Sequence, residues 1–265
     1  MTSTCAVPLV AVDIGNSRIK LGEFHHPASS PLPLPSRSVG VPQDWTDQDL
    51  RPFLPSDPLV CKWSIASVNR PATARLLQWL ASQGVQDVHV MVHDDMPLAI
   101  EVARPDLVGM DRLANAVAAN RLRAPNQSAI VISMGSAITV DLVSAAGAFF
   151  GGAILPGMAM AARALHEFTD LLPLVEVQVA PAGLGKSTEE AIRAGVYWGA
   201  VGAVRELVSR LAERHAPVEI LLTGGAAPDF AAVLSKEDDP PLRFVPHLTL
   251  SGIAIAAMQA PPAGR

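Results

Sequence analysis

The sequence has few cysteines and no long uninterrupted apolar run. Only Cys5 and Cys61 occur among 265 residues, too few for a disulfide framework and without the paired spacing of a zinc site. We therefore expect a reducing, cytoplasmic location. The most apolar stretch, residues 129–165, is broken by Asp141 and Pro156, so it predicts buried strands and a helix instead of a membrane span.

Basic clusters and several catalytic signatures are missing too. The net charge is -5, and Lys and Arg are scattered, which argues against a nucleic-acid partner. The N-terminus lacks a basic leader and meets Asp13 too early for a signal peptide. The sequence has no GxSxG, HExxH or paired CxxC motif, so it lacks the signatures of serine hydrolases and zinc enzymes.

What is present is enough apolar sequence for a large core, arranged with the periods of an α/β protein. Apolar residues make up 49% of the chain, which allows two compact domains of ordinary size. A strand, a polar turn and a second strand occupy the stretch before residue 25. Strand, helix and strand then follow between residues 59 and 92, the succession typical of an α/β sheet. Residues 27–58 are rich in Pro, Ser and Asp and predict loops and short edge strands.

The opening pattern occurs twice. DIGNSRIKL, from Asp13, and SMGSAITVD, from Ser133, each place a strand, a glycine turn and another strand in succession. This echo predicts a duplicated α/β fold: an N-terminal domain at residues 1–117 and a C-terminal domain at residues 118–265, with a cleft between them. Ser187 predicts the start of a long helix that ends near His215, and residues 248–259 predict a closing helix.

Glycine turns at the ends of strands suggest phosphate binding. Glycine lets the backbone approach a ligand closely and presents several N–H donors at once. Asp13 could hold Mg²⁺ directly or through water. An ordinary hairpin turn would explain any one of these glycine turns alone. Three of them at strand ends favour an ATP-binding site. The turn residues are Gly15, Asn16 and Ser17, then Gly135 and Ser136, then Gly224 and Gly225, where an adenine or ribose could approach bare backbone.

A P-loop is not a good explanation of GLGKS at residues 183–187. Ala180 stands where the first glycine of that motif belongs, and no clear buried strand precedes it. Asp111-Arg112 is a stronger candidate. A carboxylate at a helix start can simply favour the helix dipole, but Asp111 could also accept a proton from a substrate hydroxyl, while Arg112 binds a carboxylate or phosphate.

Six segments resemble the type III pantothenate kinase family and follow one another in the order found there. The resemblance spans nearly the whole chain and is weakest over residues 27–58. It implies an actin-like (ribonuclease H-like) fold, ATP-dependent phosphorylation of pantothenate, a homodimer, and a requirement for K⁺ or NH₄⁺. The segments are DIGNSRIKLGEF, PDLVGMDRLANAVAA, MGSAITVD with GGAILPGM, GKSTEEAIRAGVYWG, LLTGGAAP and LTLSGIAIA.

The resemblance also assigns roles to individual residues. Asp111 would be the catalytic base, and Asp13 would help bind Mg²⁺. Lys20 would join the turn residues at the phosphates, and Ser133 occupies the place of a monovalent-cation ligand. The residues expected to contact pantothenate are Gly109, Met110, Arg112 and Thr188, with Thr188 also near the monovalent cation.

The sequence departs from the family pattern at four positions: Val102, Ser133, Ser136 and Ile138. Ser133 replaces the usual Asp, and a neutral hydroxyl should bind a cation more weakly than a carboxylate. Two alternatives to a pantothenate kinase follow. One is a weak or inactive relative that keeps the fold for binding or regulation; the other is a kinase of the same superfamily with another small hydroxylated substrate.

Overall fold

The division of the chain differs from the expected one at the C-terminus. The computed structural model describes residues 8–25, 32–54, 61–177, 180–235 and 241–259. Two compact units emerge: unit 1 comprises residues 1–122 and 247–265, and unit 2 comprises residues 123–246. The predicted boundary lay at 117/118, with all later residues in the second domain. Instead the last helix returns to unit 1, because it packs against the helix that begins at Met110.

The central strand of unit 1 reads as an unbroken apolar run because both of its faces are covered. All six residues of β1 are buried. It pairs antiparallel with β2 and parallel with β4, in a sheet of order β3-β2-β1-β4-β5. The strands are β1 (Leu9–Ile14), β2 (Arg18–Phe24), β3 (Arg37–Pro42), β4 (Lys62–Ser67) and β5 (Val88–Val90).

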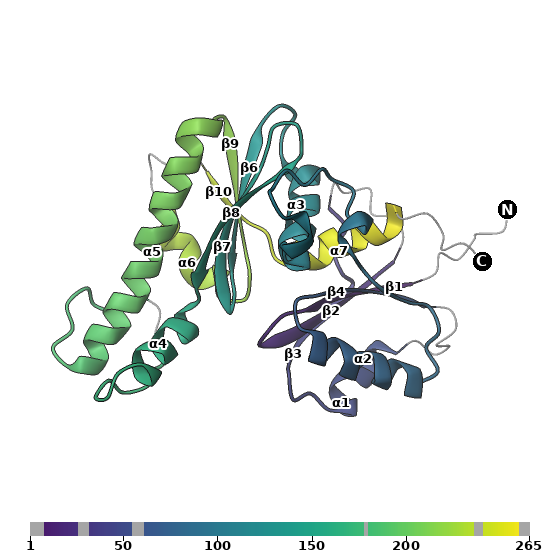
Figure 1. Cartoon of the computed structure of the whole chain (residues 1–265), viewed down its shortest axis with the longest axis horizontal. Helices are drawn as coiled ribbons and strands as arrows, with labels where there is room; N and C mark the ends of the chain where they lie inside the picture. The colour runs from purple at the N-terminus through teal and green to yellow at the C-terminus, as the bar shows by residue number, and fades with distance from the viewer. Residues whose placement is uncertain (1–7, 26–31, 55–60, 178–179, 236–240, 260–265) are drawn as a thin grey trace. The chain divides into compact units, whose positions relative to one another are not determined.

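Helices cover both faces of this sheet. Figure 1 shows α1 and α2 on one side and α3 and α7 on the other. Asn69 caps α2 by accepting a hydrogen bond from Ala72 N at 3.1 Å, and Pro71 sits in the first turn, where its missing N–H costs nothing. The helices are α1 (Asp47–Leu50), α2 (Arg70–Ser82), α3 (Met110–Leu122) and α7 (Leu248–Gln259), with 3₁₀ turns η1 (Arg51–Phe53), η3 (His93–Asp95) and η4 (Pro105–Leu107).

Helices α3 and α7 approach each other unusually closely. A Cβ atom built on Gly252 of α7 would lie 1.8 Å from the carbonyl oxygen of Ala114 in α3. Thr249 Oγ1 donates a hydrogen bond to Asn115 Oδ1 at 2.9 Å between the same helices. This contact ties the end of the chain to the helix whose first turn holds Asp111.

The sheet of unit 2 repeats the pairing of the first. Its order is β10-β9-β6-β7-β8, in which β6 takes the place of β1, pairing antiparallel with β7 and parallel with β9. The predicted duplication is therefore confirmed. The strands are β6 (Ser128–Met134), β7 (Ala137–Val143), β8 (Phe149–Pro156), β9 (Val218–Thr223) and β10 (Leu242–Phe244).

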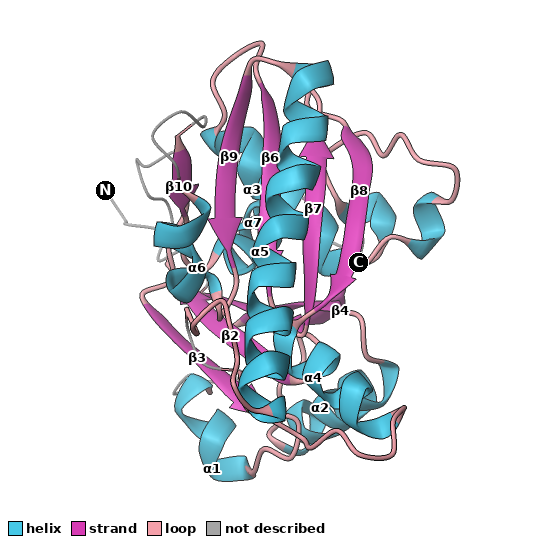
Figure 2. Ribbon diagram, turned by 90° about the vertical axis from the view of Figure 1, so that its left-hand side faces the viewer, coloured by secondary structure: helices cyan, strands magenta, loops and turns pink. Residues whose placement is uncertain are grey.

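One long helix covers a face of the second sheet. Figure 2 shows α5 running along the strands, where Tyr197 stacks on Phe230 of α6 with ring centroids 4.9 Å apart. Ser187 caps α5 as predicted, accepting from Glu190 N at 3.2 Å, while the Glu190 carboxylate accepts from Lys186 N. The helices are α4 (Met158–Glu167), α5 (Thr188–His215) and α6 (Ala227–Leu234), of which α6 was not predicted.

Where the structure describes them, the Pro-rich segment and Cys61 agree with what the sequence predicted. Residues 32–54 supply β3, an edge strand as predicted, with α1 and η1. The rest of the 27–58 segment and Cys5 lie outside the described residues. Burial raises the pKa of the Cys61 thiol to about 11, so it is protonated and unreactive at neutral pH. Among the described helices, none is both long and apolar enough to span a bilayer.

Candidate active site

The first glycine turn joins β1 to β2. Gly15 N donates to Arg18 O at 3.1 Å, closing a tight turn that leaves Asn16 and Ser17 exposed. A Cβ atom on Gly15 would lie 3.3 Å from the same carbonyl oxygen, closer than most side chains tolerate. The predicted strand, turn and strand are confirmed here.

Asp13 and Lys20 form a charged pair beside this turn. The two residues are register partners on β1 and β2, and Lys20 Nζ donates to Asp13 Oδ2 at 3.2 Å. Asp13 is only 5% exposed, whereas the Lys20 side chain is 41% exposed. Asp13 fits Mg²⁺, since this ion is usually held by one or two carboxylates, with waters and substrate phosphates completing its shell. Among the described residues no group of three or more His, Cys, Asp or Glu forms a protein-only metal site.

The Asp111 carboxylate occupies space left by the missing side chain of Gly109. A Cβ atom on Gly109 would lie 2.5 Å from Asp111 Oδ1. That oxygen accepts a hydrogen bond from Arg112 N at 2.9 Å, in the first turn of α3, where the helix dipole favours a negative charge. The preceding residue, Val108, is also fixed, because its carbonyl oxygen bonds to His93 Nε2 at 2.9 Å.

Unit 1 brings these two groups of residues together at one edge of its sheet. Val68, which follows β4, donates its N–H to Ile14 O at 3.0 Å, next to Asp13. The Val68 side chain would also lie 3.4 Å from a Cβ atom on Gly109. The carboxyl ends of β1 and β4 therefore adjoin the start of α3, and such edges are where open α/β sheets bind ligands.

Sequence reasoning missed His247, which lies close to Lys20. It adopts a left-handed φ of 59° immediately before α7, with its Nε2 3.5 Å from Ser38 Oγ. Burial lowers the pKa of His247, and the nearby Lys20 ammonium lowers it further. This imidazole is therefore neutral at physiological pH. No motif in the sequence marks it.

The second glycine turn is enclosed by two other glycines of unit 2. Gly135 N donates to Ala137 O at 3.0 Å. A Cβ atom on Gly157, before α4, would lie 2.4 Å from the carbonyl oxygens of Gly135 and Ser136. A Cβ atom on Gly224, which has φ 104°, would lie 2.3 Å from Met134 O. Unit 2 thus brings the predicted Gly135-Ser136 and Gly224-Gly225 turns together, with Gly157 as an unpredicted third member.

A row of hydroxyl side chains crosses the sheet beside this turn. Ser133 pairs with Thr139 on one side and Thr223 on the other, so the three side chains share one face of the sheet. Thr139 Oγ1 is buried without a hydrogen-bond partner. Asp141, two residues along the same face, is 1% exposed. A set of neutral oxygen ligands, of which Thr139 Oγ1 lacks a hydrogen-bond partner, fits a weakly bound monovalent cation.

Thr188 lies in a different part of unit 2. It is the exposed first residue of α5, after the GLGKS segment, which is preceded by coil and not by a strand, as the sequence predicted. A Cβ atom on Gly185 would lie 2.2 Å from Ala191 N, so this loop packs on the helix instead of cradling a phosphate. A contact between Thr188 and the substrate stays a prediction.

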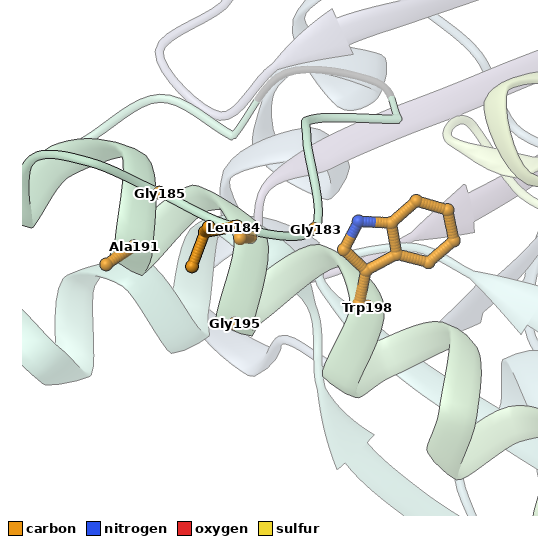
Figure 3. A pocket seen from close by; sticks show the side chains of 7 residues that line it. Gly183, Leu184, Gly185, Ala191, Gly195 and Trp198 are labelled. Carbon is orange, nitrogen blue, oxygen red and sulfur yellow. The ribbon is translucent and has the colours of Figure 1, made fainter.

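The same loop borders a pocket of about 450 Å³ on α5 (Figure 3). Trp198 forms one wall and ties the loop down by donating its indole N–H to Pro181 O at 2.9 Å. The lining carries no charged side chain. It consists of Gly183, Leu184, Gly185, Ala191, Ala194, Gly195 and Trp198.

Comparison with known proteins identifies the family. The sequence profile described as type III pantothenate kinase matches residues 9–210. A type III pantothenate kinase of Legionella pneumophila (strain Corby) is 43% identical over 164 residues, 61% of this chain and 62% of that protein, so the match spans under two thirds of the relative. One of Rhodospirillum rubrum is 40% identical over 188 residues, 68% of this chain and 72% of that protein.

Similarity to solved structures supports the fold alone. A glucokinase from an Antarctic psychrotroph superimposes with a TM-score of 0.53 at 13% identity, over 96% of this chain and 99% of that chain. The predicted actin-like α/β architecture is therefore confirmed. With the profile match and the similarity to the Rhodospirillum protein, it follows that this chain belongs to the type III pantothenate kinase family.

Proposed function

We propose that this protein transfers the γ-phosphoryl group of ATP to the primary hydroxyl of pantothenate, giving 4′-phosphopantothenate and ADP, the first step of coenzyme A biosynthesis in the cytoplasm. One observation carries the proposal: the Asp111 carboxylate sits against Gly109, at the edge of the sheet that also holds the Asp13–Lys20 pair. A proton acceptor beside a phosphate-binding turn is the arrangement that a kinase of this family requires.

The glycine turns and Lys20 would hold the nucleotide's phosphates. Gly15 N–H is bonded to Arg18 O, so the N–H groups of Asn16 and Ser17 would donate to phosphate oxygens, and the Lys20 ammonium would add a positive charge. When bound, Mg²⁺ neutralises charge on the triphosphate, with Asp13 as its ligand, directly or through water. In unit 2, Gly135 and Ser136 would take the corresponding part, and the bare backbone at Gly224-Gly225 would admit the adenine or ribose.

Asp111 would accept the hydrogen bond of the pantothenate hydroxyl and direct its oxygen at the γ-phosphorus. As the new P–O bond forms and the bond to the ADP oxygen breaks, the hydroxyl proton passes to Asp111. A carboxylate is a weak base, but in a loose transition state the proton leaves late, so orientation matters most. Arg112 would bind the substrate carboxylate. Gly109, Met110 and Thr188 would contact the rest of the substrate.

The hydroxyl row of Ser133, Thr139 and Thr223 is the proposed site for K⁺ or NH₄⁺. Replacing Ser133 by Asp should lower the K⁺ concentration that gives half-maximal rate. A charge about 4 Å from the ion contributes about 1 kcal/mol even in a water-like dielectric, a factor of about five. Potassium titrations of the initial rate measure this, with the exposed Ser209→Asp as the control.

Ser133→Asp also separates two explanations of the serine at this position, a weakened enzyme and a cation site built from other residues. A large rise in kcat would favour the alternative of a weakened relative, whereas an unchanged K⁺ requirement would remove the hydroxyl row from the cation site.

An exposed apolar surface on unit 2 supports the proposal of a homodimer. Phe168 and Leu171 are 85% and 87% exposed, and they lie in the segment that packs onto α5 through Ala162, Val175 and Ile192. Two large apolar side chains exposed only three residues apart are more typical of an interaction site than of free surface. A second copy of the chain is the occupant we propose.

The double variant Phe168→Glu, Leu171→Glu should therefore shift the protein from dimer to monomer in light scattering coupled to size exclusion. Burying two new carboxylates at the contact would cost several kcal/mol. Leu34→Glu, at a leucine 59% exposed in unit 1, is the matched control and should remain dimeric. A wild-type monomer, or a double variant that stays dimeric, would contradict the assignment.

A coupled assay tests the main proposal. ADP release is measured with MgATP and K⁺ present, with and without pantothenate, and pantothenate-dependent release is expected. A panel of small hydroxylated acids and sugars tests the alternative substrate class. Nucleotide binding without turnover of any acceptor would instead support the alternative of a binding or regulatory protein.

A further inference from the structure

The segment after β3 contacts the first glycine turn through one side chain. Gln43 Nε2 donates a hydrogen bond to Gly15 O at 2.6 Å. Gln43 belongs to the 27–58 segment, to which neither the motifs nor the proposed mechanism gives a role. The carbonyl it binds is the one linked directly to the N–H of Asn16, within the turn proposed to hold phosphates.

Gln43 is itself held firmly by the helix behind it. Arg75 of α2 donates to Gln43 O at 2.7 Å and to Trp45 O, and its guanidinium lies 4.3 Å from the centroid of the Trp45 ring. Trp45 is 3% exposed and belongs to the core of unit 1. The backbone of Gln43 therefore has a fixed position, so only the rotamers of its own side chain are ordered when its amide reaches Gly15 O.

The hydrogen bond determines which way the next N–H points. A peptide group is planar and trans, so its C=O and N–H point in opposite directions. Holding Gly15 O toward Gln43 turns the Asn16 N–H away from Gln43. Without this bond the Gly15–Asn16 peptide could rotate more easily about ψ of Gly15 and φ of Asn16, because Gly15 has no Cβ to restrict its ψ and Asn tolerates positive φ better than most residues.

We propose that Gln43 is a positioning residue that sets the orientation of the Asn16 amide for nucleotide phosphates. The inference rests on the proposed function, since it assumes that this turn binds ATP. It also gives the Pro-rich segment a role, because the fixed part of that segment, from β3 to Trp45, supports the turn from behind. An amide already oriented needs no rearrangement when the phosphate arrives.

The test compares variants that differ in the donor. Gln43→Leu removes it at similar size, Gln43→Glu replaces it by an acceptor, and Gln43→His keeps a ring N–H at similar reach. Gln48→Leu, at an exposed glutamine of α1, is the matched control. Binding of MgADP and of a magnesium complex of a non-hydrolysable ATP analogue is measured by calorimetry, and KM is measured for both substrates.

Gln43→Leu should weaken nucleotide binding about three- to tenfold, the effect of one neutral hydrogen bond, and Gln43→Glu should weaken it more. Gln43→His should restore most of the loss, and the KM for ATP should rise while that for pantothenate stays unchanged. Nucleotide binding by Gln43→Leu within twofold of wild type would overturn the inference. If Gln43→Leu does not fold, equal nucleotide binding by Gln43→Glu and Gln43→His would overturn it. A wild type that binds neither nucleotide would overturn the proposed function and this inference together.

Discussion

Replacing Asp111 by Asn should lower kcat for pantothenate phosphorylation by about 10²- to 10⁴-fold, the usual contribution of a positioned proton acceptor. The substitution is conservative in shape. Asn keeps an oxygen that can accept the hydrogen bond from Arg112 N, now made to Asp111 Oδ1 at 2.9 Å. It also fits the space beside Gly109. What it removes is the negative charge and the ability to take a proton.

The measurement is kcat at saturating ATP and pantothenate, together with the Kd for nucleotide and the melting temperature. We expect both of the latter to stay near the wild-type values, because the Asp13–Lys20 pair is untouched. Asp106→Asn is the matched control, since its carboxylate is exposed in η4 and pairs only locally with Arg104 among the contacts of that turn. A fall in kcat of less than about fivefold for Asp111→Asn would remove Asp111 from the catalytic role.

Replacing Gly252 by Ala should destabilise the protein strongly, although Ala is the better helix former. The gain in helix propensity is about 1 kcal/mol. Against it, the new methyl carbon would lie 1.8 Å from Ala114 O, a rigid backbone atom, so α3 and α7 must separate along their contact. Overpacking of this kind costs about 1–3 kcal/mol and can cost more where backbone blocks the way. The clash therefore outweighs the propensity.

Thermal unfolding followed by circular dichroism measures the effect. With a clash at the upper end, about 3 kcal/mol, the net loss after the propensity gain is about 2 kcal/mol. At about 2–4 °C per kcal/mol for a chain of this size, a fall of about 4–8 °C is expected. Gly202→Ala is the control, since a Cβ atom there meets nothing within 4 Å and Gly202 lies inside α5. That variant should melt at or slightly above the wild-type temperature. An equal melting temperature for Gly252→Ala would show that the close approach of α3 and α7 is not needed.

Local patterns predicted most of the elements because their causes are local. The buried run of β1, the cap Ser187 and the two glycine turns each follow from neighbouring residues. The repeated hairpin then gave the duplication, since each copy carries its own strand period. Helix α6 was missed because its Pro228 and Asp229, only three and four residues after Gly225, resemble a loop.

Other features depend on contacts between distant parts of the chain. Helix α7 belongs to unit 1 because Gly252 fits against Ala114, a pairing across more than a hundred residues that no periodicity reveals. The positions of Gln43 and His247 are of the same kind. Each is a single polar side chain in an unremarkable stretch, placed beside Gly15 or Lys20 only by the fold.

The return of the last helix to unit 1 has a consequence for synthesis on the ribosome. Unit 2 is one continuous segment, complete once residue 246 has been made, whereas unit 1 lacks the partner of α3 until α7 is translated. The face of α3 that packs against α7 therefore lacks this partner while the intervening residues are added. Unit 1 is thus begun before unit 2 and completed after it.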